Sequence, residues 1–534
     1  MSRSHRPRFI PYCDRVTPGW RGRLSRLLAT LSVAVLAWSP AVWAEDSFPA
    51  TNPVRSTEAG KVAGLDGDVL TFKGIPYAAP PVGALRWRPP QQPQQWKGVR
   101  QAAQFGADCF GDARLRQGSL APNMSEDCLY LNVWAPRDGG ARTHPVMVWV
   151  YGGSFTGGTS ALSMYDGAAL AQKGVVVVTF NYRTNIFGFF AHPALSLESQ
   201  QGVSGNYGLL DILAALRWVK GNIGAFGGDP RQVTVFGESA GASALGLLLT
   251  SPQSQGLFQR AILESPGLTR PLATLSESSA LGLKLGDLAN LRSMDAAALM
   301  SLAQSGLPAV RSLEKPRPIG PIIDGWLLPR SDRDAIDSGR FLHVPLLIGS
   351  NADEGRLFTR AIPVATRADY QQYLEAQFGA GAATMARCYP AKSDQDVPQA
   401  VSRLFGGEEF IRGIDAFSVA WAARKVPVWR YRFDGPGDPG IPPPTHAGEL
   451  PFVFLRGGAT PADRSLSERM ATAWTTFAKS GDPNGAGLPN WPVYNPGGSL
   501  MVFGPTIGPE PARPLRRTSD CSGEPRSGTA DAKG

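Results

Sequence analysis

One serine in this sequence lies in a setting that could make it a nucleophile. Ser239 is the centre of the segment GESAG at positions 237–241, between a predicted strand over 233–236 and a predicted helix over 240–249. A strand that turns sharply into a helix holds such a serine in strained backbone geometry, which only small residues on either side permit. Its hydroxyl would project above the sheet at a helix N-terminus, where developing negative charge is stabilised. The alternative is that Ser239 only caps the helix.

A nucleophilic serine needs a base, and histidine is the usual one. Where a serine follows a strand in this way, the acid and then the histidine come later in the chain. Of the five histidines, only His343 and His446 follow Ser239. His343 directly precedes a predicted strand over 344–348, which favours a buried or edge position. His446 lies in the loop after a predicted strand over 428–433, so we predict that His446 is the base.

A carboxylate that orients the imidazole should follow the strand over 344–348. Asp353 and Glu354 both lie in the loop after that strand. Either carboxylate could hold the imidazole tautomer and stabilise the imidazolium. The spacing alone therefore leaves both residues open.

Backbone amides for a developing oxyanion are expected after the predicted strand over 146–150. That strand runs into the segment YGGSF at 151–155. Glycines there let the backbone approach a substrate and direct N–H groups towards it. The alternative is an ordinary turn.

The elements that must position these residues alternate between strands and helices. Apolar, β-branched runs predict buried strands, and helical patterns lie between them over 209–219, 240–249 and 466–479. This alternation indicates an α/β protein with a mostly parallel sheet covered on both faces. The segment from about 270 to 320 has a helical pattern without a strand, and we expect it to form a cap over one end of the sheet.

The N-terminal residues 1–44 have the pattern of a secretory signal. Arginines precede a short apolar run over 27–38, and small residues follow it. The alternatives are an uncleaved membrane anchor or translation that starts downstream, near Val16. These residues hold seven arginines and one acid, so removing them lowers the net charge from +9 to about +3. A mature chain of that net charge gives no indication of nucleic-acid binding. We predict one domain over 45–512 and a polar tail over 513–534.

Five cysteines are present, and Cys13 belongs to the predicted signal. The other four would enter an oxidising compartment after export, where three pairings are possible. The pairing of Cys388 with Cys521 stays open. The sequence has no Cys-x-x-Cys motif and no histidine cluster that would indicate a zinc site. Nothing in the sequence indicates a nucleotide or flavin site.

Five segments together resemble the type-B carboxylesterases, the family of cholinesterases and several microbial esterases and lipases. They are FGGDP through GESAG at 226–241, EDCLYLNV at 126–133, GIPYA at 74–78, FNYR at 180–183 and GDPN at 481–484. The matching positions span roughly residues 54 to 505. The resemblance implies an α/β-hydrolase fold and a Ser-His-Glu triad, with Glu354 rather than Asp353 as the acid beside Ser239 and His446.

The resemblance also implies three oxyanion donors and one disulfide. The donors are the amides of Gly153, Ser154 and Ala240, and the disulfide joins Cys109 and Cys128. Ser154 stands where the family usually has a third glycine. The family's cholinesterases also carry a tryptophan between these two cysteines, and this chain has none there.

These features predict an exported enzyme that hydrolyses carboxylic esters, without a cofactor, on small soluble substrates with short or medium acyl chains. An aromatic ester is also possible, because Phe155 and Phe358 could line the site. The segment between Cys109 and Cys128 is charged rather than apolar, which argues against an interfacial lipase. The same fold could also carry an amidase or a non-catalytic adhesion protein. We expect no partner nucleic acid and no stable membrane insertion after the signal is cleaved.

Overall fold

The computed structural model describes residues 52–512, apart from 139–142, 308–311, 438–439, 441 and 486. The predicted signal over 1–44, the tail over 513–534 and Cys521 lie outside the described residues. The predictions made for them therefore remain predictions.

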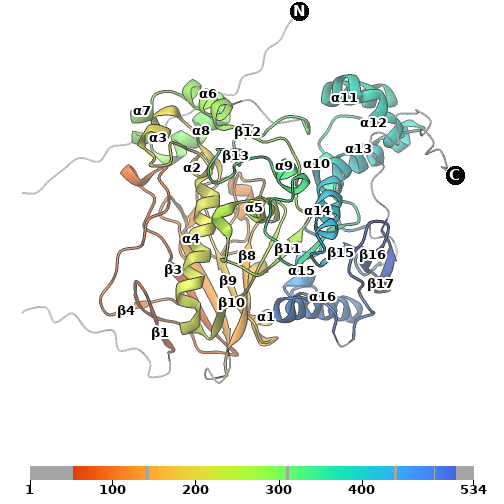
Figure 1. The fold of residues 1–534 in the computed structure, drawn as a ribbon. Helices are drawn as coiled ribbons and strands as arrows, with labels where there is room; N and C mark the ends of the chain where they lie inside the picture. Colours follow the sequence, from red (N-terminus) through yellow and green to blue (C-terminus); the bar gives the residue numbers. More distant parts are fainter. Residues whose placement is uncertain are drawn as a thin grey trace, which may run out of the picture. The chain divides into compact units, whose positions relative to one another are not determined.

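A ten-stranded sheet forms the centre of the described chain (Figure 1). The strands from β16 to β9 are parallel, while the β17–β16, β9–β7 and β7–β3 pairs are antiparallel. In spatial order they are β17 (Gly508–Pro511), β16 (Ser499–Phe503), β15 (Val428–Phe433), β14 (Leu346–Asn351), β11 (Arg260–Glu264), β10 (Gly228–Glu238), β8 (His144–Val150), β9 (Val176–Phe180), β7 (Tyr130–Pro136) and β3 (Val69–Pro76).

Two of the parallel strands are buried along their whole length. Every residue of β9 and of β14 is buried. Because successive side chains of a strand point to opposite faces, this burial requires cover on both sides of the sheet. Helices supply that cover, among them α1 (Ala168–Gln172), α4 (Tyr207–Asn222), α5 (Ala240–Leu249), α14 (Arg412–Ala423) and α16 (Pro461–Ser480). The predicted mixed architecture, with a mostly parallel sheet, is confirmed.

The segment expected to be a helical cap differs from the prediction in one respect. Helices α6 (Leu275–Leu285), α7 (Leu288–Ser293) and α8 (Ala296–Gly306) fill most of it. The expectation that it lacks a strand is wrong, because β12 (Ala273–Thr274) pairs with β13 (Ile322–Ile323). A strand of two residues is too short to show a hydrophobic alternation, so the sequence pattern could not reveal it.

A second, smaller core lies outside the sheet. It is formed by α11 (Arg367–Phe378), α12 (Ala382–Cys388) and α13 (Val397–Gly406), which lie together in Figure 1. Buried side chains such as Leu374 and Leu404 hold these helices against one another. The helices therefore form a compact unit that can serve as a wall of the site described below.

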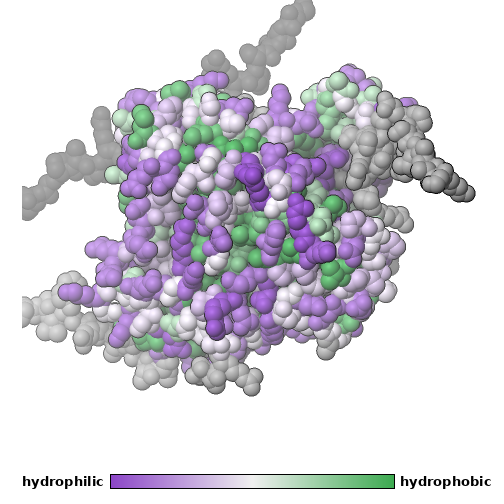
Figure 2. Space-filling model, in the orientation of Figure 1, coloured by the Kyte–Doolittle hydropathy of each residue, from purple (hydrophilic) through white to green (hydrophobic). Residues whose placement is uncertain are grey.

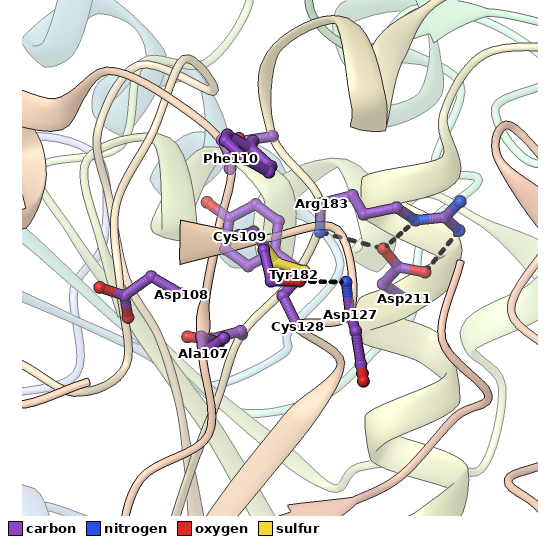
Figure 3. The surroundings of a disulfide bond; sticks show 12 residues. Ala107, Asp108, Cys109, Phe110, Asp127, Cys128, Tyr182, Arg183 and Asp211 are labelled. Atoms are coloured by element: carbon purple, nitrogen blue, oxygen red, sulfur yellow. Dashed lines mark hydrogen bonds and ion pairs between the residues drawn. A yellow bond between two sulfur atoms is a disulfide. The ribbon is translucent and has the colours of Figure 1, made fainter. Parts of the chain in front are cut away.

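A disulfide joins Cys109 and Cys128, as the resemblance implied (Figure 3). It closes a segment with a sequence separation of 19 residues, a restraint of about 3 kcal/mol on the chain-entropy model. Beside it, Arg183 donates from Nε and Nη2 to the two carboxylate oxygens of Asp211, each at 2.8 Å. Both ionic side chains are buried. This pair fastens the loop after β9 to helix α4.

Among the described residues, no helix combines the length and the apolar character needed to cross a membrane. Figure 2 shows hydrophilic side chains over most of the visible face, with apolar side chains gathered in patches between them.

Candidate active site

Ser239 lies at the sharp turn between β10 and α5. Its backbone has φ 56° and ψ −124°, a conformation that residues other than glycine rarely adopt. A Cβ added at Gly237 would lie 2.6 Å from the carbonyl oxygen of Val150, and one at Gly241 would collide with the same oxygen. The glycines of the GESAG segment are therefore required by close packing against the end of β8, which places Ser239 beyond the edge of the sheet.

His446 and Glu354 meet at the same edge. Glu354 follows β14 and His446 follows β15, and His446 Nδ1 lies 2.6 Å from Glu354 Oε2. The other oxygen of Glu354 accepts hydrogen bonds from the backbone amide of Asn351 and from the Ser265 hydroxyl, each at 2.6 Å. A carboxylate held in this way fixes the imidazole with its proton on Nδ1.

Asp353, the other carboxylate of the same loop, makes different contacts. Its Oδ1 accepts a hydrogen bond from Ser402 at 2.6 Å, and its Oδ2 lies 3.2 Å from Arg356 Nε. Asp353 is half-buried, whereas Glu354 is buried. The structure thus brings Glu354, and not Asp353, to His446.

The second imidazole nitrogen faces Glu238 in this structure. His446 Nε2 lies 3.0 Å from Glu238 Oε1, an ion-pair distance without hydrogen-bond geometry. Within the described part of the chain, His446 Nε2 has no hydrogen-bond partner, so Ser239 Oγ is not bonded to it. A Cβ added at Gly152 would lie 2.6 Å from Glu238 Oε2 and 2.8 Å from Ser239 Cβ. Glu238 Oε2 and Ser239 Cβ therefore both lie beside Gly152.

Buried carboxyl groups lie near this histidine. Besides Glu354 they are Glu238 and Glu449, and a further buried carboxyl group, Glu264, lies near both of these. Burial raises the pKa of Glu238 to about 8 and that of Glu449 to about 7, and it raises the pKa of Glu264 well above its usual value. Sequence reasoning missed Glu264 and Glu449. In the sequence, Glu264 ends the run that forms β11, and Glu449 follows His446 by three residues. Neither position by itself indicates a role at the site.

The carboxylates also act on His446 itself. Burial lowers the pKa of His446, but Glu238 and Glu354 outweigh that effect and raise the pKa to about 9. The ordinary pKa of a histidine is near 6.5, and the carboxylates that raise it here could not be placed from the sequence.

The glycine-rich loop after β8 runs alongside Ser239. Gly153 has φ 113°, and an added Cβ would collide with the carbonyl oxygen of Gly157. Ser154 has φ 56° and lines the same cavity as Ser239 and Ala240. The backbone amide of Asn185 donates to the carbonyl oxygen of Phe155 at 2.7 Å, and this bond holds the loop in place. Two of the three residues predicted as oxyanion donors, Ser154 and Ala240, thus line the cavity with Ser239, and Gly153 directly precedes Ser154.

A cavity of about 740 Å³ opens at Ser239. Aromatic rings form part of its wall, and the ring of Phe410 lies 4.5 Å and that of Phe358 5.0 Å from the imidazole of His446. The expectation for Phe358 thus agrees with its position in this wall. Phe155 does not line this cavity; it is buried against Phe189 and lines a small adjoining one.

Known proteins resemble most of the described chain. The model of the carboxylesterase family matches residues 51–503. A fumonisin B1 esterase from Sphingopyxis macrogoltabida is 56% identical over 469 residues, which cover 85% of this chain and 87% of that protein. A para-nitrobenzyl esterase from Bacillus subtilis (strain 168) is 39% identical over 83% of this chain and 93% of its own length.

The fold is shared with a solved structure. A PNB esterase superposes with a TM-score of 0.75 at 37% identity, covering 86% of this chain and 98% of its own. The family match extends over most of the described residues, and the resemblance noted from the sequence segments is confirmed. The chain therefore belongs to the carboxylesterase family, has the α/β-hydrolase fold and is a hydrolase of carboxylic esters.

Proposed function

We propose that the chain hydrolyses small soluble esters through an acyl-enzyme, with Ser239 as nucleophile, His446 as base and Glu354 as the acid that orients His446. The observation that carries this proposal is the 2.6 Å contact between His446 Nδ1 and Glu354 Oε2 next to the strained Ser239 turn. The order serine, acid, histidine along the chain also fits this mechanism.

Each step of this mechanism can be assigned to a group of the site. Ser239 Oγ attacks the ester carbonyl carbon while His446 Nε2 accepts its proton, and Glu354 stabilises the imidazolium. This step requires the Ser239 hydroxyl to take the position beside Nε2 that Glu238 occupies in this structure. The amides of Gly153, Ser154 and Ala240 would donate to the oxyanion. His446 then protonates the leaving alcohol, and a water activated by the same imidazole hydrolyses the acyl-enzyme.

The carboxylate of Glu238 sets the pH range of this reaction. The base must be neutral, so kcat/KM should rise with pH as His446 loses its proton, and its raised pKa places that limb above the ordinary range. Glu238→Gln removes a carboxylate that raises this pKa, so the limb should move to lower pH. The measurement is kcat/KM between pH 5.5 and 9.5, with exposed Glu468→Gln as control. An unmoved limb in Glu238→Gln would contradict the role given to Glu238.

The preferred substrates are proposed to be soluble esters with short or medium acyl chains. The loop closed by the disulfide carries Asp112 and Arg114 at its surface, where an interfacial lipase would need an apolar face. The two relatives above are named for fumonisin B1 and para-nitrobenzyl esters, so these esters are the first candidate substrates to test. We also propose that residues 1–44 direct export, which the disulfide supports because such bonds persist in oxidising compartments.

A panel of chromogenic substrates tests this proposal. We expect purified protein to hydrolyse p-nitrophenyl esters fastest at short or medium acyl lengths, with little activity on the matching p-nitroanilides. A maximum at sixteen carbons, with a jump in rate when droplets form, would instead show a lipase. Faster cleavage of the anilides would show an amidase, and no cleavage of any substrate would contradict the proposed function.

A further inference from the structure

Two arginines line the cavity that opens at Ser239. Arg270 follows β11, and Arg317 lies in the segment between α8 and β13. The side chain of Arg270 is 11% exposed and that of Arg317 is 28% exposed. A mechanism of ester hydrolysis by Ser239, His446 and Glu354 uses neither of them, so their presence beside the nucleophile needs a separate explanation.

A single carboxylate lies between the two guanidinium groups. Arg270 Nη1 donates to Glu409 Oε2, and Arg317 Nη2 donates to Glu409 Oε1 at 2.7 Å. The Glu409 side chain is only 5% exposed. Two positive charges against one negative charge leave this cluster with a net charge of about +1, while Asp369 adds a carboxylate elsewhere in the cavity wall. A buried, uncompensated charge is costly unless a ligand or another ion pairs with it.

One donor of this group is unused. Arg270 Nη2 donates to the carbonyl oxygen of Ser312 at 2.7 Å, but Arg270 Nε is buried and has no hydrogen-bond partner among the described residues. Buried polar groups in proteins almost always have partners, and an orphaned one calls for a missing ligand or water. A guanidinium group with a free N–H matches a carboxylate in both charge and geometry.

The charged group is close to the nucleophile. Ser243 Oγ donates to the Ser239 carbonyl oxygen at 2.9 Å and accepts from the Gly267 amide at 2.8 Å. A Cβ added at Gly267 would lie 3.0 Å from Glu409 Oε1 and 3.6 Å from Ser243 Oγ. The ion cluster is thus separated from the first turn of α5 by little more than one glycine.

The position of the arginines favours one half of the ester. The leaving alcohol must lie within reach of His446, beside the ring of Phe410. The arginines also line a small adjoining cavity together with Ser243 and Gly267, and neither His446 nor Phe410 contributes to that cavity. Arg270 and Arg317 share the cavity at Ser239 with Phe410, but of these three only the arginines also line the adjoining cavity. We therefore assign them to the acyl half, which stays on Ser239 after the alcohol leaves.

We propose that the preferred esters carry a free carboxylate on their acyl group and that Arg270 and Arg317 bind this carboxylate. The inference rests on the proposed function, since it names the substrate class of the same site. An alternative is that the cluster only fastens the segment around Arg317 to the π-helical turn Gly407–Ile411 that carries Glu409. A purely structural tie would not distinguish charged from neutral substrates.

The test compares p-nitrophenyl hydrogen glutarate with its neutral methyl ester, which has the same reacting bond. In the wild-type protein we expect kcat/KM to be about 10- to 100-fold higher for the free acid, mainly through a lower KM, as for a hydrogen bond to a charged group. In Arg317→Gln the ratio of the two kcat/KM values should approach one, and Arg317→Lys should restore part of it.

Arg292→Gln is the matched control, because Arg292 is 21% exposed, pairs with Glu198 and does not line the cavity. This variant should keep the wild-type ratio. Equal rates on both glutarates in the wild-type protein would overturn the inference, with no variant needed. So would a preference that appears only when the carboxylate is on the alcohol half, as in 4-acetoxybenzoate against its methyl ester. Failure to hydrolyse any of these esters would instead contradict the proposed function.

Discussion

Ser239→Ala is expected to lower kcat on p-nitrophenyl esters by about 10³- to 10⁶-fold. The variant removes the only atom that can form the acyl-enzyme in the proposed mechanism, while the oxyanion amides and the cavity remain. Alanine is smaller than serine, so it should fit the strained turn at residue 239, which packs closely against the end of β8. The measurement is single-turnover and steady-state hydrolysis at one pH.

The control for this variant is Ser301→Ala, because Ser301 is exposed on α8. It should hydrolyse the same esters at the wild-type rate. Both proteins should give the same thermal unfolding midpoint as the wild type within a few degrees, which separates lost chemistry from lost fold. Ester hydrolysis by Ser239→Ala at more than about a tenth of the wild-type rate would show that another group is the nucleophile.

Glu354→Gln is expected to cost about 10⁴-fold in kcat, because the amide keeps the shape of the side chain but loses the charge that stabilises the imidazolium. The 2.6 Å contact with His446 and the bonds from Asn351 and Ser265 place this carboxylate at the imidazole. Steady-state kinetics on a short p-nitrophenyl ester measure the effect.

Asp353→Asn provides the matched comparison, since it changes the neighbouring carboxylate in the same way. Asp353 contacts Ser402 and Arg356, not His446, so its loss should reduce kcat by less than about tenfold. If the ranking were reversed, with Asp353→Asn the more damaging change, Asp353 would be the acid and the family resemblance would have misled.

The sheet could be predicted where its strands are buried on both faces. The strands predicted over 146–150, 233–236, 344–348 and 428–433 fall on β8, β10, β14 and β15, and the last matches the structure over Val428–Phe433. Edge strands such as β3 and β17 were missed, because they are partly exposed and carry weak patterns. The strand β11 was also missed, because it begins with an arginine and ends with a glutamate, which leaves an apolar run of only three residues.

The residues of the site could be predicted as far as they lie in short motifs. Ser239, Glu354 and His446 each follow a recognisable strand, so the parallel sheet had to bring them to one edge. The contacts of His446 with Glu238, and the approach of Arg270 and Arg317 to Glu409, depend on packing between distant segments. No spacing along the chain encodes such contacts, which is why the charge of the cavity became visible only in the structure.

The central claim, that Ser239 is the nucleophile, is tested most directly by covalent labelling. A p-nitrophenyl phosphonate should be attacked by Ser239 Oγ, with loss of p-nitrophenolate and formation of a stable phosphonyl-serine. We predict one phosphonyl group per chain, located by peptide mass spectrometry on Ser239, with ester hydrolysis lost in proportion to the label. Full loss of activity with the label on another residue, or full labelling of Ser239 with activity retained, would contradict the account.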